Sequence, residues 1–103
     1  MKAIVKRIDE EIGHFEDIEN ELKVLQDLVG GYIECITFEE IVVICDEEGL
    51  LKGKKRNCTV DTPLFKNSFV GDIVVVGHDE DDFTDVPIDL QKWAKMIGKE
   101  RYI

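Results

Sequence analysis

The 103-residue sequence has few side chains of the kinds that perform covalent or metal chemistry. It contains two histidines and three cysteines, and Cys35, Cys45 and Cys58 show no CxxC spacing. An odd number of widely spaced thiols predicts reduced cysteines, so neither a disulfide nor a zinc site is expected. Cys58 lies near Arg56, but a packed thiol is the simpler interpretation. Because no Ser-His-Asp order, Walker loop or GxGxxG turn occurs, we expect no enzyme and no cofactor.

Long apolar runs are also absent. No segment reaches the 18 or more apolar residues of a membrane span, and the opening MKAIVKRIDE lacks the apolar core of a signal peptide. These features predict a cytoplasmic protein. The length is that of one small domain, so we expect residues 1–103 to form a single domain.

Positive charge is scarce as well. Against 23 acidic residues stand 13 lysines and arginines, which gives a net charge of -10. A surface that neutralises phosphates must present excess Lys and Arg, so direct binding to nucleic acid is not expected. An acidic surface is typical of a soluble protein, and it is also what a protein that mimics DNA presents to a basic partner.

The hydrophobic pattern predicts an α+β fold with a small mixed or antiparallel sheet of about five strands, one helix after the first hairpin and a C-terminal helix. Asn20 is expected to cap the first helix and Gly30-Gly31 to end it. The apolar run IVVIC predicts a central strand that is covered on both faces. The expected elements are strands over 3–8 and 14–18, a helix over 21–29, strands over 32–38, 41–45 and 73–76, and a helix over 88–97.

The span 46–72 shows no regular pattern except for a possible short element over 57–65, NCTVDTPLF. An irregular span of this length is often functional. It contains LLKGKKRN, which places four cations within five positions of an acidic chain. One interpretation is a solvated loop; the other is an anion site, in which backbone N–H groups, Lys and the Arg fork bind phosphate.

For the anion site, the candidate ligand-binding residues come from the basic run and from two aromatic residues at predicted strand ends. The aromatic side chains would stack on the bases of a cyclic nucleotide, although core packing is the more common role of such residues. The candidates are Lys52, Lys54, Lys55, Arg56, Asn57, Tyr32 and Phe83.

A second charged segment, GHDEDDFTD, carries five carboxylates. It fails the pattern of an EF-hand loop, because the sixth and twelfth positions counted from Asp79 are Thr84 and Leu90. We expect no metal there. An acidic face for docking on a basic protein is the alternative, and its predicted members are residues 79–85 with Asp9, Glu10, Glu11, Glu16, Asp17 and Glu19.

Several segments together resemble a family of small proteins from phages, prophages, plasmids and Firmicutes that is known only as a domain of unknown function. They are the MKAIV opening, GGYIE, an EEG-LKG turn leading to an asparagine, and a GD-VVVG-DF segment at residues 71–83. In the pattern of that family, apolar residues or proline often stand where this chain has Lys54, Lys55 and Arg56. The mobile-element setting of the family implies a role in conflicts between phage and host.

Two functions are compatible with these features. The first is a non-enzymatic homodimer or higher homo-oligomer that counters host defence by sequestering a small phosphorylated ligand, such as a cyclic nucleotide signal. The second is an acidic inhibitor or DNA mimic that docks on a basic host protein. Sequence alone leaves both open.

Overall fold

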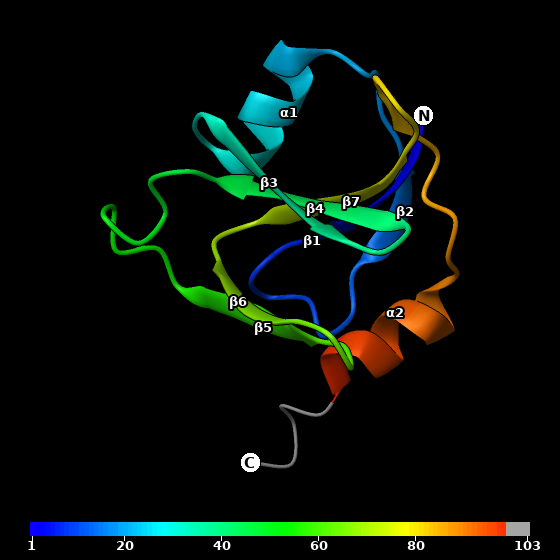
Figure 1. Cartoon of the computed structure of the whole chain (residues 1–103). Coiled ribbons are helices and arrows are strands. Elements are labelled where there is room, and N and C mark those ends of the chain that lie inside the picture. Colours follow the sequence, from blue (N-terminus) through cyan, green and yellow to red (C-terminus); the bar gives the residue numbers. More distant parts are fainter. Residues whose placement is uncertain (99–103) are drawn as a thin grey trace.

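The computed structural model describes residues 1–98, and an antiparallel sheet runs through the middle of them (Figure 1). Its strand order is β2-β1-β7-β4-β3, and the short β8 also pairs with β7. These strands are β1 (Lys2–Lys6), β2 (His14–Asp17), β3 (Ile33–Phe38), β4 (Ile41–Asp46), β7 (Ile73–His78) and β8 (Phe83–Thr84). The predicted α+β class and the predicted hairpins 3–8/14–18 and 32–38/41–45 are confirmed.

Strand β4 is buried on both faces, as the run IVVIC predicts. On one face, Val42 and Ile44 pack in a cluster with Leu25 of helix α1 (Leu22–Val29). On the other face, Ile41 and Val43 pack in a cluster with Trp93 of helix α2 (Leu90–Ile97). The alternation of side chains along a strand sends successive β-branched residues into two different cores, which makes β4 the centre of the molecule.

The hairpin of β5 (Arg56–Asp61) and β6 (Lys66–Val70) covers the second face beside α2. It forms a separate two-stranded sheet inside the span 46–72, where the sequence pattern predicts one short element over 57–65. Cys58, Val60 and Phe69 point into the core, while the remaining positions are mostly polar. With only three buried apolar residues in two short strands, the period-2 signal is too weak to detect from sequence.

Helix α1 ends as predicted, because Gly30 adopts the left-handed conformation of a C-cap, with φ of 80°. The predicted N-cap is wrong. Glu21 occupies the cap position, and the Asn20 amide instead donates to Asp82 Oδ1 at 2.7 Å and to the Phe83 carbonyl at 3.3 Å. Asn20 therefore joins the entry to α1 to the loop before β8.

Helix α2 begins at Leu90, two residues after the predicted start at 88, because Asp89 caps it by accepting a bond from the Lys92 amide. Trp93 is fully buried, and its ring N–H donates to the Ile12 carbonyl at 2.9 Å. Trp93 therefore belongs to the core on this face of the sheet. Within residues 1–98, neither helix is long and apolar enough to cross a membrane.

His14 bridges two carboxylates at the outer edge of the sheet. Its Nε2 lies 3.0 Å from Glu16 and its Nδ1 lies 2.7 Å from Glu10. Hydrogen bonds to Glu16 and then to Glu10 raise the pKa of His14. Because the folded protein then holds the proton more tightly than the unfolded chain, this cluster stabilises the fold below the unfolded pKa of about 6.5 and loses that effect as the pH rises through the folded pKa.

We therefore expect His14→Gln to lower the melting temperature more at about pH 5.5 than at about pH 8.5. Thermal unfolding by circular dichroism at both pH values measures the difference. In a Glu10→Gln/Glu16→Gln background, the same substitution should have an equal effect at the two pH values. An equal effect in the wild-type background would show that the cluster does not stabilise the protonated form.

Candidate functional site

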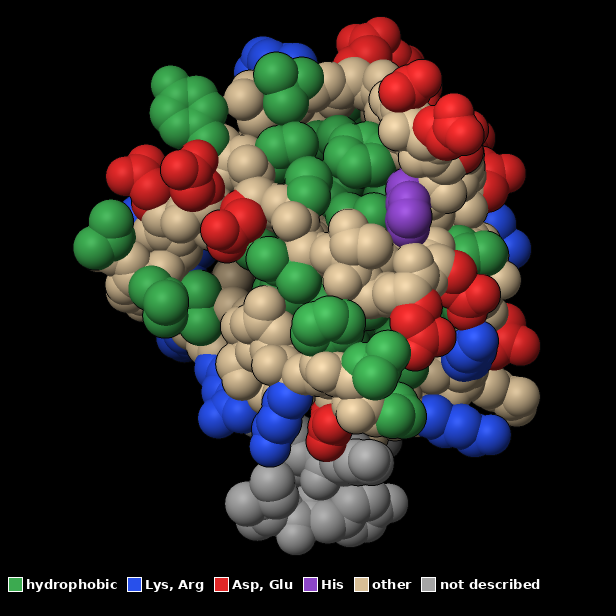
Figure 2. All heavy atoms as spheres, viewed as in Figure 1, with side chains coloured by type: hydrophobic (Ala, Val, Ile, Leu, Met, Phe, Trp, Pro, Cys, Tyr) green, Lys and Arg blue, Asp and Glu red, His purple; other side chains and the backbone are tan. Residues whose placement is uncertain are grey.

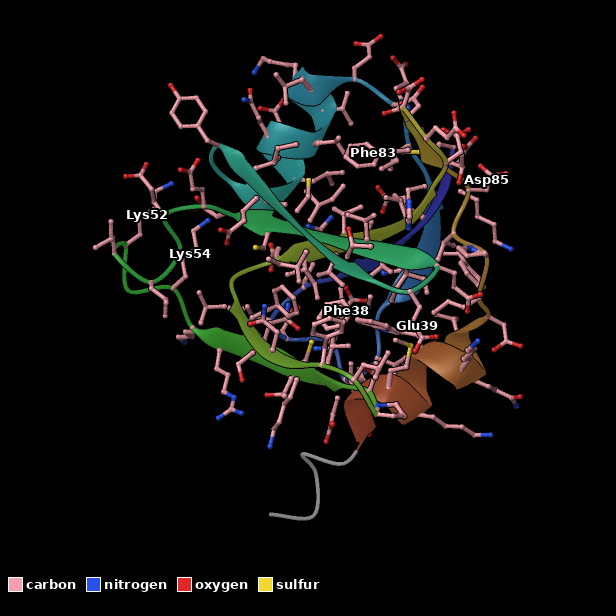
Figure 3. All side chains as sticks on the ribbon, in the orientation of Figure 1. Phe38, Glu39, Lys52, Lys54, Phe83 and Asp85 are labelled. Atoms are coloured by element: carbon pink, nitrogen blue, oxygen red, sulfur yellow. The ribbon has the colours of Figure 1, made fainter. Side chains whose placement is uncertain are left out.

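Two lysines of the basic run converge on one buried carboxylate. Figure 3 labels both lysines, Lys52 and Lys54, at the left of the molecule. Lys52 Nζ lies 2.8 Å and Lys54 Nζ lies 2.7 Å from Asp46 Oδ2, and the Asp46 side chain is fully buried. The Glu48 amide donates to Asp46 Oδ1 at 2.9 Å. Burial alone would raise the pKa of Asp46, but the bonds from Lys52 and Lys54 prevail and hold it at about 2. We call Asp46, Lys52 and Lys54 the lysine clamp.

The same ammonium groups close the end of helix α1. Lys54 donates to the Val29 carbonyl at 2.7 Å and Lys52 to the Gly30 carbonyl at 3.1 Å. Carbonyls at a helix C-terminus have no partner within the helix and carry partial negative charge, so both cations are favourably placed. The clamp thus ties the loop after β4 to the end of α1.

Two glycines leave the space that the clamp requires. A Cβ on Gly31 would lie 2.6 Å from both Asp46 Oδ1 and Lys52 Nζ. A Cβ on Gly71 would lie 2.7 Å from Lys54 Cδ, and the φ of 73° at Gly71 disfavours a side chain in any case. The GGYIE, EEG-LKG and GD segments of the sequence pattern therefore meet at one structural cluster.

Asn57 is a second structural member of the basic run. Its amide donates to the carbonyls of Lys6 and Gly71 at 2.9 and 2.8 Å, and its Oδ1 accepts from Lys6 Nζ at 2.7 Å. Lys6 is only 3% exposed and also donates to the Glu10 carbonyl at 2.8 Å. Asn57 therefore joins β5 to β1 and to the turn before β7 by solvating a buried ammonium group.

The other predicted ligand-binding residues do not form one site. Lys55 and Arg56 are exposed, and Arg56 donates to Thr59 Oγ1 at 3.0 Å. Tyr32 is 68% exposed and shares a hollow with Lys52. Phe83 lies on another side of the molecule from the labelled lysines in Figure 3, half-buried beside the acidic loop. The structure brings Tyr32 to the basic run and leaves Phe83 away from it.

The hollow of Tyr32 and Lys52, about 350 Å³ in volume, has an electrostatic lining that disfavours phosphate. The carboxylates of Asp27 and Glu48 line it together with the last residues of α1. A helix C-terminus repels anions, and Lys52 already pairs with Asp46. A similar hollow of about 260 Å³ beside Lys54 and Lys55 contains the carboxylates of Asp27 and Asp72.

The loop held by the clamp presents two leucines to solvent. Leu50 and Leu51 are 82% and 86% exposed, and we call this pair the leucine apex. Local backbone hydrogen bonds give the loop a defined shape. The Lys52 amide donates to the Glu48 carbonyl at 2.9 Å, and the Lys54 amide donates to the Gly49 carbonyl at 3.0 Å. Hydrophobic side chains protrude at the left of Figure 2, on the side where this loop lies in Figure 1. The only sequence signal for this feature was two adjacent leucines in a polar segment.

An apolar cleft of about 400 Å³ lies where the β3–β4 turn, the β5–β6 turn and α2 meet. Apolar side chains of Phe38, Ile41, Pro63 and Met96 line it. Charged side chains of both signs also line it: Glu39, Glu40, Asp61, Lys92 and Lys95. No sequence pattern indicates this cleft, because its residues come from three segments that only the fold brings together.

The acidic segments form a face only in part. Asn20 and Asp82 pin the loop 79–83 beside the end of β2, and the Lys2 amide donates to Asp85 Oδ1 at 2.8 Å. These hydrogen bonds place residues 79–85 beside the end of β2 and the residues that follow it, which include Glu16, Asp17 and Glu19. Figure 2 shows acidic side chains along the upper right of the molecule. Asp9 and Glu11 lie in the turn between β1 and β2, at the other end of that hairpin from Glu19, whereas Glu10 lies close to Glu16 because His14 bridges the two carboxylates. We define the acidic face as Glu16, Asp17, Glu19 and residues 79–85.

The buried thiols lack the character of nucleophiles. Burial raises the pKa of Cys58 to about 11 despite the nearby charges of Lys6 and Arg56. Burial and the neighbouring Glu34 raise the pKa of Cys45 to about 12. A reactive cysteine needs a lowered pKa and solvent access, so Cys58 is a packed side chain.

The clamp predicts that neighbouring lysines differ in their effect on stability. Lys54→Met should lower the free energy of unfolding by about 2 kcal/mol, because a buried carboxylate and a helix carbonyl each lose a donor. The matched Lys55→Met should change it by less than about 0.5 kcal/mol, because the Lys55 side chain is exposed. Urea unfolding measures both, and equal losses would contradict the assignment.

A comparison with known proteins identifies the family of this chain. A family model described as a domain of unknown function (DUF3846) matches residues 1–98, a segment that includes the clamp, the leucine apex and the acidic face. No curated protein and no solved structure matches the chain. Because the family model spans nearly the whole sequence, the chain belongs to the DUF3846 family.

Proposed function

We propose that the protein is a non-catalytic binding domain that docks on a basic partner protein through its acidic face. The observation that carries this proposal is the pinning of loop 79–83 by Asn20, which joins two acidic segments about sixty positions apart in the chain. A concentration of one sign of charge raises the association rate with an oppositely charged partner. In the mobile-element setting that the resemblance implies, the partner is a host protein.

The internal bonds of the acidic face support a docking role. Asp79 and Asp82 are used to shape the loop, because Asp79 Oδ1 accepts from the amide of Asp82 at 3.1 Å, and Asp82 Oδ1 accepts from Asn20 and from the Phe83 amide. Glu80 and Asp81 are exposed at the tip of the same loop. The backbone that carries them therefore has a defined shape before a partner binds, which reduces the entropy lost on docking.

The catalytic alternatives have less support. Both ring nitrogens of His14 are bonded to carboxylates, and His78 Nε2 lies 3.0 Å from the Glu39 carbonyl. The buried thiols of Cys45 and Cys58 have raised pKa values. A general base must reach a substrate proton and a thiol nucleophile must ionise, so these side chains favour binding over chemistry.

An oligolysine peptide serves as a probe for the acidic face. We expect Glu80→Lys/Asp81→Lys to weaken the binding of this peptide at low salt at least about tenfold, because two attractive charges become repulsive. Isothermal titration calorimetry at two salt concentrations measures the affinity and its salt dependence.

A matched variant distinguishes the effect of the acidic face from the effect of the overall net charge. Glu47→Lys/Glu48→Lys makes the same change in charge at exposed positions beside the leucine apex. It should weaken peptide binding by no more than about twofold. If both variants weaken binding equally, only the overall charge matters and the proposed face has no special role.

Sequestration of a cyclic nucleotide stays a prediction. Fewer of the predicted cations are available to bind phosphate, because Lys52 and Lys54 already pair with Asp46. Phosphate binding by the basic run now depends on Lys55 and Arg56. Replacing both with glutamine removes their charge and leaves the clamp intact. If the protein retains cyclic nucleotides in native mass spectrometry, the Lys55→Gln/Arg56→Gln variant should lose them. Retention by the double variant would exclude the basic run as the site.

A further inference from the structure

The leucine apex and the apolar cleft are exposed features that neither folding nor the proposed acidic docking explains. Solvent exposure of two adjacent leucines gains nothing for a monomer, and contiguous apolar surface usually marks an interaction site. Both features occur in the same chain. We propose that the leucine apex of one copy inserts into the apolar cleft of a second copy, so that the protein assembles head to tail.

The apex and the cleft are too far apart to meet within one chain. Ile41 at the start of β4 lines the cleft, and Asp46 at the end of β4 anchors the loop of the apex. Six residues of strand span about 17 Å, so the two features lie at opposite ends of the same strand. Figure 3 shows the corresponding separation between the labelled Phe38 and Glu39 and the labelled Lys52 and Lys54. A chain cannot fill its own cleft with its own apex.

The two surfaces are complementary in polarity. Around the apex, the exposed Glu47 and Glu48 precede the leucines and the exposed Lys55 follows them, while Lys52 belongs to the clamp. Around the cleft, Glu39 comes from the β3–β4 turn and Lys95 from α2, while Lys92 of α2 already pairs with Glu40 at 2.6 Å. Each rim therefore has an acidic side and a basic side, so that one orientation pairs acid with base on both sides.

The apex is also prepared for insertion. The lysine clamp and the backbone bonds within the loop fix its shape before contact, which reduces the entropy lost on binding. The cleft volume of about 400 Å³ lies within the range of pockets that bury small apolar groups. Leu64 and Phe65, exposed at the β5–β6 turn, extend the apolar surface beside it.

Contact between two different surfaces leaves one apex and one cleft open in every assembly that has not closed into a ring. Sedimentation velocity from about 1 μM to about 1 mM should therefore show species larger than a dimer as the concentration rises. Wild-type protein that remains monomeric over this range would overturn the proposal.

Two kinds of variant each remove one surface. Leu50→Asp/Leu51→Asp removes the apex at positions that are exposed in the fold, and Met96→Glu places a charge in the cleft. Each variant alone should be monomeric, and an equimolar mixture should form a one-to-one dimer and nothing larger, because one intact apex and one intact cleft remain. A mixture that stays monomeric would contradict the proposal.

Three further variants serve as a replacement and as controls for the assembly experiment. Lys95→Trp fills the mouth of the cleft from an exposed position and replaces Met96→Glu if that variant does not fold. Leu22→Asp removes an exposed leucine from α1 and should assemble as the wild type does. Glu80→Lys/Asp81→Lys should also assemble normally, so that failure of head-to-tail assembly and failure of the acidic face are separate results.

Discussion

The buried carboxylate of Asp46 is the constraint on which the arrangement of the loops depends. It lies at the end of the central strand and forms ion pairs with Lys52 and Lys54 of the following loop. The same lysines donate to the carbonyls at the end of α1. A buried charge without partners is strongly destabilising, so the loop must fold back to supply them. In this way one side chain fixes the end of a helix, the course of a loop and the exposure of two leucines.

Much of the fold could be predicted because its signals are local. The run IVVIC indicates a strand without a polar face, and a glycine pair after an apolar helical stripe indicates a helix end. The sequence pattern does not indicate the β5–β6 hairpin, because its buried apolar side chains are only Cys58, Val60 and Phe69. The expected cap at Asn20 failed because a bond to Asp82, far along the chain, outcompetes the local one.

The basic run illustrates why the candidate site was harder to predict than the fold. Charge density suggested phosphate or water as the partner of Lys52 and Lys54, yet the partner is an aspartate six and eight positions earlier. Asn57 was grouped with ligand-binding residues and instead solvates the buried Lys6. Spacing along the sequence does not reveal which side chains a loop turns inward, and the apolar cleft required the complete tertiary fold.

Hydrogen exchange in wild-type protein and in Asp46→Asn tests the central role of the clamp most directly. If the clamp holds the loop, the amides of Lys52 and Lys54, which bond within the loop, should lose protection in the variant. Amides of the paired strands β4 and β7 should keep most of theirs. Unchanged protection of the loop amides would contradict the account, because the loop would then keep its shape without the buried carboxylate.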